Sequence, residues 1–175
     1  QYLNLKKEID EAINEVIKNS SFVRGKYVEE FEESFSSKIG TKYCISCGNG
    51  TDALYLAVRA LDIGKGDEVI TSPMTWVSST NSIIMNNAKP VFVDIKNDYN
   101  IDENKIEKAI TKKTKAIMIV HWSGRPCELD KIKKICRRYK LKLIQDSCHA
   151  IDAKFRGKSI VSYGDICTYS MHPLK

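Results

Sequence analysis

The chain has 175 residues, 42% of them hydrophobic, which is enough for one globular domain with a sizeable core. Its formal net charge is +6, but the basic residues are not interleaved with aromatics and belong to no known nucleic-acid-reading module, so we expect no nucleic-acid partner. No apolar run approaches the roughly 18 residues that span a bilayer, and the amino terminus lacks the apolar core of a signal peptide; we therefore expect a soluble, cytoplasmic protein without membrane contact.

Two amphipathic helices are predicted first. Apolar residues recur at helical spacing from Ile9 to Ile17, which predicts a helix ending near residues 19–21. A second helix is expected from about Tyr27 to Ile39, where Gly40 stops it.

From Lys42 onward, short apolar runs alternate with helical segments. Strict alternation of strand and helix is typical of βαβ units, so we predict the α/β class, with a mostly parallel sheet covered by helices on both faces. No linker or repeat marks an internal boundary, and residues 155–158 are expected to form a hairpin turn. The predicted strands are 43–46, 68–71, 90–93, 116–120, 141–144 and 166–170; the predicted helices are 51–61, 75–85, 103–110 and a basic helix carrying Lys131 and Arg138.

The six cysteines are expected to be free thiols, because the chain is large and shows no export signal. Cys44 and Cys47 have CxxC spacing, yet no second pair lies at zinc-ribbon distance. We therefore interpret them as buried strand thiols, in preference to a metal or redox site, and predict no metal site.

The segment Gly48–Ala53 links a predicted strand to a predicted helix. Glycines allow backbone amides to approach an anion, and a helix amino terminus offers free N–H donors, so a phosphate site is predicted; the alternative is a simple helix cap. The segment also fits the G-x-G-x-x-A dinucleotide fingerprint. However, the acids Asp67 and Glu68 precede the next strand run, whereas an acid that binds ribose must follow its strand.

Three side chains lie where predicted strands end or just beyond. Asp146 either caps a turn or, when buried beside a pyridine nitrogen, keeps that nitrogen protonated so that the ring accepts electrons. His149 suits a hydrogen bond to a phenolate oxygen of the same ring, or a purely structural role. Trp76 either stacks on a planar cofactor or packs beneath a loop.

The last six residues contain a hydroxyl and an amine. Ser170 either donates to a phosphate or belongs to a turn, and Lys175 either forms a Schiff base with an aldehyde cofactor or is a solvated terminal residue. A lysine, a carboxylate and an imidazole at strand ends together favour pyridoxal phosphate (pyridoxal 5'-phosphate, PLP).

Several motifs, in the same order, resemble the sugar aminotransferases of the DegT/DnrJ/EryC1/StrS family, which are PLP enzymes of fold type I. The resemblance implies that Lys175 carries the cofactor and shuttles a proton, that Asp146 pairs with the pyridine nitrogen, and that His149 lies near the ring oxygen. It further implies stacking by Trp76. The motifs are residues 22–32, 49–54, 64–70, 88–94, 146–149, 164–165 and 170–175, and the implied phosphate ligands are Gly50, Thr51 and Ser170, with Asp52 nearby.

Two positions depart from the family pattern: Gln145 stands where glutamate is common, and Lys26 where proline is common. Neither change removes a catalytic group. Some relatives have histidine in place of the lysine and dehydrate sugars, so Lys175 favours transamination.

The resemblance implies transfer of an amino group, from a donor such as glutamate, to a keto group of a nucleotide-linked sugar by a homodimer. Relatives continue past the lysine, so residues 1–175 are expected to be the amino-terminal part of the PLP-binding large domain and to be inactive alone. Three alternatives stay open: a PLP-dependent sugar dehydratase, a nicotinamide-dependent (NAD) dehydrogenase, and a non-catalytic ligand sensor.

Overall fold

The computed structural model describes residues 2–172, which divide into two compact units. The described part of the helical unit comprises residues 2–38 and 42–46, and that of the sheet unit comprises residues 39–41 and 47–172. Neither junction is marked by a Gly/Ser-rich linker, so the division is not visible in the composition of the chain. The assignment of both units to one large domain stays a prediction.

The helical unit contains α1 (Tyr2–Lys18) and most of α2 (Lys26–Ile39), which confirms both predicted helices, although α1 begins well before Ile9. Glu15 joins the two helices, because its Oε2 accepts a 2.6 Å hydrogen bond from the hydroxyl of Tyr27 and its Oε1 lies 3.6 Å from Nζ of Lys26.

The predicted strand 43–46 is wrong: these residues are not assigned as a strand and belong to neither of the described sheets. Tyr43 and Ile45 are 71% and 81% exposed, so their apolar alternation does not correspond to a buried face. The backbone N–H of Ser46 donates instead to Oε1 of Glu32 at 2.7 Å. A strand needs a ladder partner, and the apolar pattern alone does not supply one.

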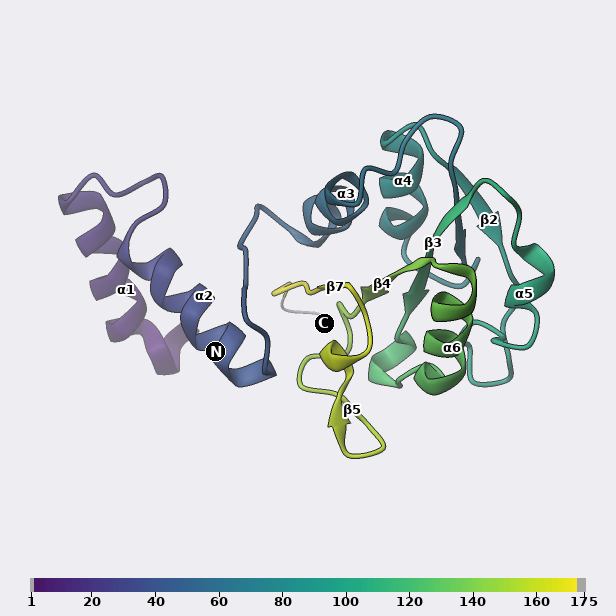
Figure 1. The fold of residues 1–175 in the computed structure, drawn as a ribbon. Helices are drawn as coiled ribbons and strands as arrows, with labels where there is room; N and C mark the ends of the chain where they lie inside the picture. Colours follow the sequence, from purple (N-terminus) through teal and green to yellow (C-terminus); the bar gives the residue numbers. More distant parts are fainter. Residues whose placement is uncertain (1, 173–175) are drawn as a thin grey trace. The chain divides into compact units, whose positions relative to one another are not determined.

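The sheet unit is built on five parallel strands in the order β2-β1-β3-β4-β7 (Figure 1). This confirms the α/β class and all of the predicted strands after residue 46, with small shifts at their ends. The strands are β1 (Glu68–Thr71), β2 (Lys89–Phe92), β3 (Thr114–Val120), β4 (Lys142–Asp146) and β7 (Ile166–Thr168).

A two-stranded hairpin precedes β7. Its strands β5 (Lys154–Phe155) and β6 (Lys158–Ser159) are antiparallel, and the two turn residues Arg156 and Gly157 both have positive φ, 51° and 78°. Two consecutive residues with positive φ are typical of a tight hairpin, so the predicted turn is confirmed.

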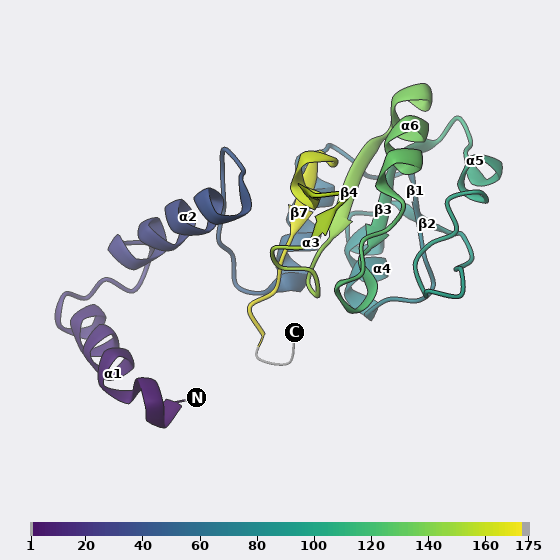
Figure 2. The same ribbon diagram turned by 90° about the horizontal axis from the view of Figure 1, so that it is seen from below.

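Helices cover both faces of the sheet, as Figure 2 shows from below. α3 (Gly50–Ala60) and α4 (Val77–Met85) pack on one face, and α6 (Leu129–Tyr139) on the other. The predicted helix 103–110 shrinks to α5 (Ile106–Ala109), because Asp102 accepts the N–H of Asn104 in a local turn. Short 3-10 turns lie at η1 (Trp122–Gly124) and η2 (Ile160–Ser162).

Side chains of the central strands alternate between two buried clusters. One cluster faces α6 and contains Ile70, Ile117, Ile119 and Leu143; the other faces α3 and α4 and contains Val69, Ala116, Met118 and Ile144. Because successive strand residues point to opposite faces, Gln145 continues the first set and Asp146 the second. The end of β4 therefore presents its carboxylate to the side on which α3 and α4 lie.

Candidate functional site

Asp146 is the last residue of β4 and is buried, with 5% of its surface exposed. Its Oδ2 accepts a hydrogen bond from Oγ of Ser79 at 2.7 Å, and its Oδ1 accepts one from the backbone N–H of Cys148 at 3.2 Å. No ion pair within residues 2–172 includes Asp146. A buried carboxylate without a cation is costly, and a cationic ligand would offset that cost.

A second hydroxyl supports Ser79. Oγ1 of Thr75 lies 2.6 Å from Oγ of Ser79. A hydroxyl has one proton to donate, and Ser79 uses its proton in the hydrogen bond to Asp146, so Thr75 is the donor to Ser79. Neither Thr75 nor Ser79 was predicted from the sequence. The signal was present as small polar residues spaced one helical turn apart, at positions 75, 79 and 82. Ser79 and Ser82 are buried on α4, and Thr75 is half-buried just before the helix begins.

The amino terminus of α3 is capped by Asn49. Its side-chain Oδ1 accepts the N–H of Asp52 at 2.9 Å, and its carbonyl accepts the N–H of Ala53 at 3.0 Å. The cap therefore exists, but it satisfies only these two amides. No described residue accepts a hydrogen bond from the N–H of Gly50 or Thr51, which leaves two donors for an anion.

Ser170 lies against this helix terminus. A Cβ placed on Gly50 would be 3.0 Å from Cβ of Ser170 and 3.3 Å from Sγ of Cys148, so only glycine fits without displacing its neighbours. The hydroxyl of Thr51 adds a further polar group, 2.7 Å from Oγ of Ser78. The structure thus gathers the three residues predicted to hold a phosphate, and it adds Cys148, which the sequence analysis did not place there.

Asp52 points elsewhere. Its Oδ2 accepts a hydrogen bond from Nδ2 of Asn49 at 3.0 Å and would be 2.7 Å from a Cβ on Gly48. The carboxylate therefore supports the loop before α3, and its predicted place beside the phosphate stays a prediction.

Trp76 is 67% exposed immediately before α4, which excludes the interpretation as a tryptophan packed under a loop. His149 lies 5.9 Å from Trp122, ring centroid to centroid, in an edge-to-face arrangement. Their roles at a cofactor ring stay predictions. Lys175 lies outside the described residues, so its predicted role of carrying the cofactor also stays a prediction.

Gln145, on the other face of β4, belongs to a separate buried network. The backbone N–H of Cys127 donates to Nδ1 of His121 at 3.1 Å, so the proton of the neutral ring lies on Nε2, which donates to Oε1 of Gln145 at 3.0 Å. Nε2 of Gln145 donates to the carbonyl of Ile160 at 3.0 Å. Burial lowers the pKa of His121 to about 4, so the ring is neutral at pH 7.

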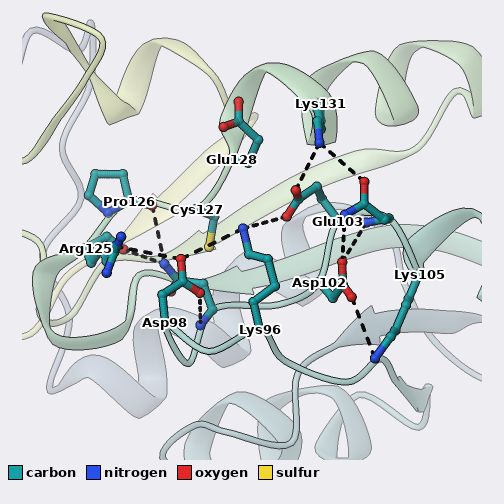
Figure 3. Close-up of polar contacts among 12 residues, drawn as sticks. Lys96, Asp98, Asp102, Glu103, Lys105, Arg125, Pro126, Cys127, Glu128 and Lys131 are labelled. Atoms are coloured by element: carbon teal, nitrogen blue, oxygen red, sulfur yellow. Dashed lines mark hydrogen bonds and ion pairs between the residues drawn. The ribbon is translucent and has the colours of Figure 1, made fainter.

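A further cluster of charged side chains surrounds Glu103. Figure 3 shows buried Glu103 between Lys96 and Lys131, with Nζ to carboxylate distances of 2.8 and 3.3 Å. Beside it, a shallow depression of about 480 Å³ is lined by residues 95–98 and 102. The acids there are paired with lysine or arginine, so this network holds loops together.

Within residues 2–172, none of the cysteines at positions 44, 47, 127, 136, 148 and 167 forms a disulfide. Cys47 is exposed and neither Cys44 nor Cys47 lies in a strand, so their interpretation as buried strand thiols is wrong. Within residues 2–172, no group of three or more His, Cys, Asp or Glu side chains is arranged to hold a metal ion. None of the described helices combines the length and apolar composition that crossing a membrane requires.

A parallel sheet that presents a free helix amino terminus and a buried carboxylate at its carboxyl edge defines an α/β protein suited to a phosphorylated, cationic ligand. Residues 3–175 match the model of the DegT/DnrJ/EryC1/StrS aminotransferase family, and the chain belongs to this family.

The relatives include a sugar transaminase. The chain is 45% identical over 170 residues to the dTDP-3-amino-3,6-dideoxy-alpha-D-galactopyranose transaminase of Aneurinibacillus thermoaerophilus, covering 96% of this chain and 47% of that protein. The structure of S. venezuelae DesV in complex with a ketimine intermediate superimposes with a TM-score of 0.93 at 34% identity, over 99% of this chain and 47% of that one.

The structure of NtdA from Bacillus subtilis, with bound cofactor PMP, superimposes with a TM-score of 0.90 at 34% identity, over 98% of this chain and 39% of that one. The chain therefore spans about half the length of the relatives it matches.

Proposed function

We propose that this chain is part of a PLP-dependent aminotransferase that moves an amino group, from a donor such as glutamate, to a keto group of a nucleotide-linked sugar. The observation that carries the proposal is Asp146, a buried carboxylate with two hydrogen-bond donors and no cationic partner among residues 2–172. It lies on the sheet face covered by the helix whose first two N–H groups are unused. Membership of the aminotransferase family supports the same assignment.

The residues present fit the cofactor. When bound, PLP supplies a protonated pyridine ring that delocalises the electrons left behind when a proton leaves the substrate carbon. Asp146 pairs with the N–H of that ring, because a charge-assisted hydrogen bond keeps the nitrogen protonated. The phosphate is held by the N–H groups of Gly50 and Thr51 and by the hydroxyls of Thr51 and Ser170.

Three further side chains complete the proposed site. Trp76 stacks on the ring, for which its exposure leaves it accessible, and His149 hydrogen-bonds the ring oxygen. Lys175 anchors the cofactor and carries a proton between the donor and acceptor carbons. Asp52 is assigned only a supporting place near the phosphate.

The working enzyme is proposed to be a cytoplasmic homodimer of a longer protein, with small-molecule substrates and no nucleic-acid or membrane partner. Residues 1–175 form the amino-terminal part of its large domain in this proposal. We expect this part alone to be inactive.

The test uses the purified full-length protein with added PLP. We expect absorbance near the edge of the visible range. Borohydride should remove this absorbance and leave the cofactor covalently attached to the unsubstituted protein but not to Lys175→Ala. A colourless protein that ignores PLP would contradict the proposal.

The same experiment separates the alternatives. With a keto sugar and glutamate, an aminotransferase yields an amino sugar, whereas a dehydratase yields a deoxy sugar. Binding of a nicotinamide cofactor instead of PLP would indicate a dehydrogenase, and a biological output that survives Lys175→Ala would indicate a ligand sensor.

A further inference from the structure

Two consecutive hydroxyls at the start of α4 each contact a different part of the proposed cofactor site. Oγ of Ser78 lies 2.7 Å from Oγ1 of Thr51, in the first turn of α3. Oγ of Ser79 donates to Oδ2 of Asp146, at the end of β4, also at 2.7 Å. Both serines are buried, with exposed fractions of 7% and 0%.

Adjacent residues of a helix point about 100° apart. One turn of α4 is therefore held in two directions, by α3 through Ser78 and by β4 through Ser79. Thr51 is one of the residues proposed to bind the phosphate, and Asp146 is the residue proposed to bind the ring nitrogen. Nothing else among the side-chain hydrogen bonds of residues 2–172 joins either residue to α4.

We propose that Ser78 and Ser79 are positioning residues that fix the phosphate end and the ring-nitrogen end of the cofactor site relative to each other. This inference rests on the proposed function, because it takes Thr51 and Asp146 as cofactor ligands. A ligand with a rigid ring and a short phosphate arm must contact the phosphate end and the ring-nitrogen end of the site at the same time. A site held at the right separation before binding loses less free energy in ordering its side chains.

The direction of each hydrogen bond gives each serine a distinct role. Ser79 accepts a hydrogen bond from Thr75 and donates one to Asp146, so it orients the carboxylate. When the hydroxyl of Thr51 donates to a phosphate oxygen, Ser78 is the donor to Thr51. Loss of Ser78 should therefore affect the phosphate contact, and loss of Ser79 the ring contact.

The test compares PLP with pyridoxal, which has the same ring and no phosphate. Full-length Ser78→Ala and Ser79→Ala are stripped of cofactor, and the dissociation constants of both probes are measured by absorbance titration. Ser82→Ala is the matched control: Ser82 is equally buried on α4, but its hydroxyl donates to the carbonyl of Ser79 at 2.8 Å and not to the site.

We expect Ser78→Ala to weaken PLP binding about tenfold and to leave pyridoxal binding nearly unchanged, because it acts on the phosphate. Ser79→Ala is expected to weaken both probes by a similar factor and to change the pH dependence of the absorbance of bound PLP, because it acts on the ring nitrogen. Ser78→Thr and Ser79→Thr keep the hydroxyl and should restore binding.

The proposal is overturned if Ser78→Ala and Ser79→Ala bind both probes as Ser82→Ala does, or if both affect the two probes identically. If an alanine variant does not fold, Ser78→Cys and Ser79→Cys keep the shape with a weaker donor, and the same pattern is required of them. Failure of the proposed function is distinguishable, because the unsubstituted protein would then bind neither probe.

Discussion

His121 and Gln145 form a buried neutral pair on the face of β4 opposite Asp146, with Nε2 of the imidazole 3.0 Å from Oε1 of the amide. The backbone N–H of Cys127 donates a hydrogen bond to Nδ1, the other ring nitrogen, so no ring nitrogen is left available to bind a second proton. A glutamine at position 145 therefore keeps this network uncharged next to the carboxylate of the proposed site.

The first prediction concerns pH. Burial lowers the pKa of His121 from 6.5 to about 4, so between these values the unfolded chain binds a proton that the folded chain does not. The free energy of unfolding should therefore fall as the pH drops through this window, by at most roughly 3 kcal/mol from this group. Urea denaturation at pH 7 and pH 4.5 measures it. His121→Gln should lose this part of the pH dependence; equal pH dependence in both proteins would contradict the assignment.

The second prediction concerns Gln145→Glu. An ionised carboxylate beside His121 favours the imidazolium, so the pKa of His121 should rise, which NMR titration of the ring protons would detect. The glutamate also loses the N–H donor to the carbonyl of Ile160, so we expect the free energy of unfolding to fall by about 1–3 kcal/mol at pH 7. An unchanged His121 titration would show that the two side chains are not in contact.

The third prediction concerns the close approach at Gly50. Alanine there would bring its Cβ to 3.0 Å from Cβ of Ser170, so the helix terminus and Ser170 must move apart. We expect Gly50→Ala to weaken PLP binding by about tenfold or more, since it displaces donors from the phosphate. Gly64→Ala is the control, because its Cβ would make only an ordinary contact of 3.5 Å with the carbonyl of Asn86. Equal binding by the two variants would contradict the phosphate assignment.

The fourth prediction concerns Asp146→Asn in the full-length protein. The amide keeps the size of the carboxylate but not its charge, so the ring nitrogen loses its counter-ion and kcat should fall by about 10²–10³-fold. Asp62→Asn is the control: Asp62 is an exposed turn residue with φ of 54°, a conformation that asparagine tolerates. Full activity of Asp146→Asn would exclude the proposed role.

Local pattern predicted much of the sheet unit. Val69 and Ile70 of β1 and their counterparts in β3 and β4 are apolar because both faces are covered, and this signal lies within a few residues of sequence. Asp146 and Ser170 were found in the same way, as polar residues at or just beyond strand ends. The same reasoning was wrong for residues 43–46, because an apolar alternation does not show whether a partner strand is present.

The contacts that define the site could not be predicted from patterns among neighbouring residues. Ser79 and Asp146 are 67 positions apart, and Thr51 and Ser78 are 27 apart, so no periodicity relates them. Asn49 as a helix cap was weighed against an anion site, whereas the structure shows that the cap leaves the amides of Gly50 and Thr51 available.

Hydrophobic periodicity and motifs lie in neighbouring residues, so the α/β class, the helices and strands after residue 46, the candidate ligands and the family could be predicted without coordinates. The strand order, the face to which Asp146 points and the serines that hold it became known from the fold. Those depend on which distant segments pack together, and packing is settled by the burial of whole faces against one another and not by any one segment.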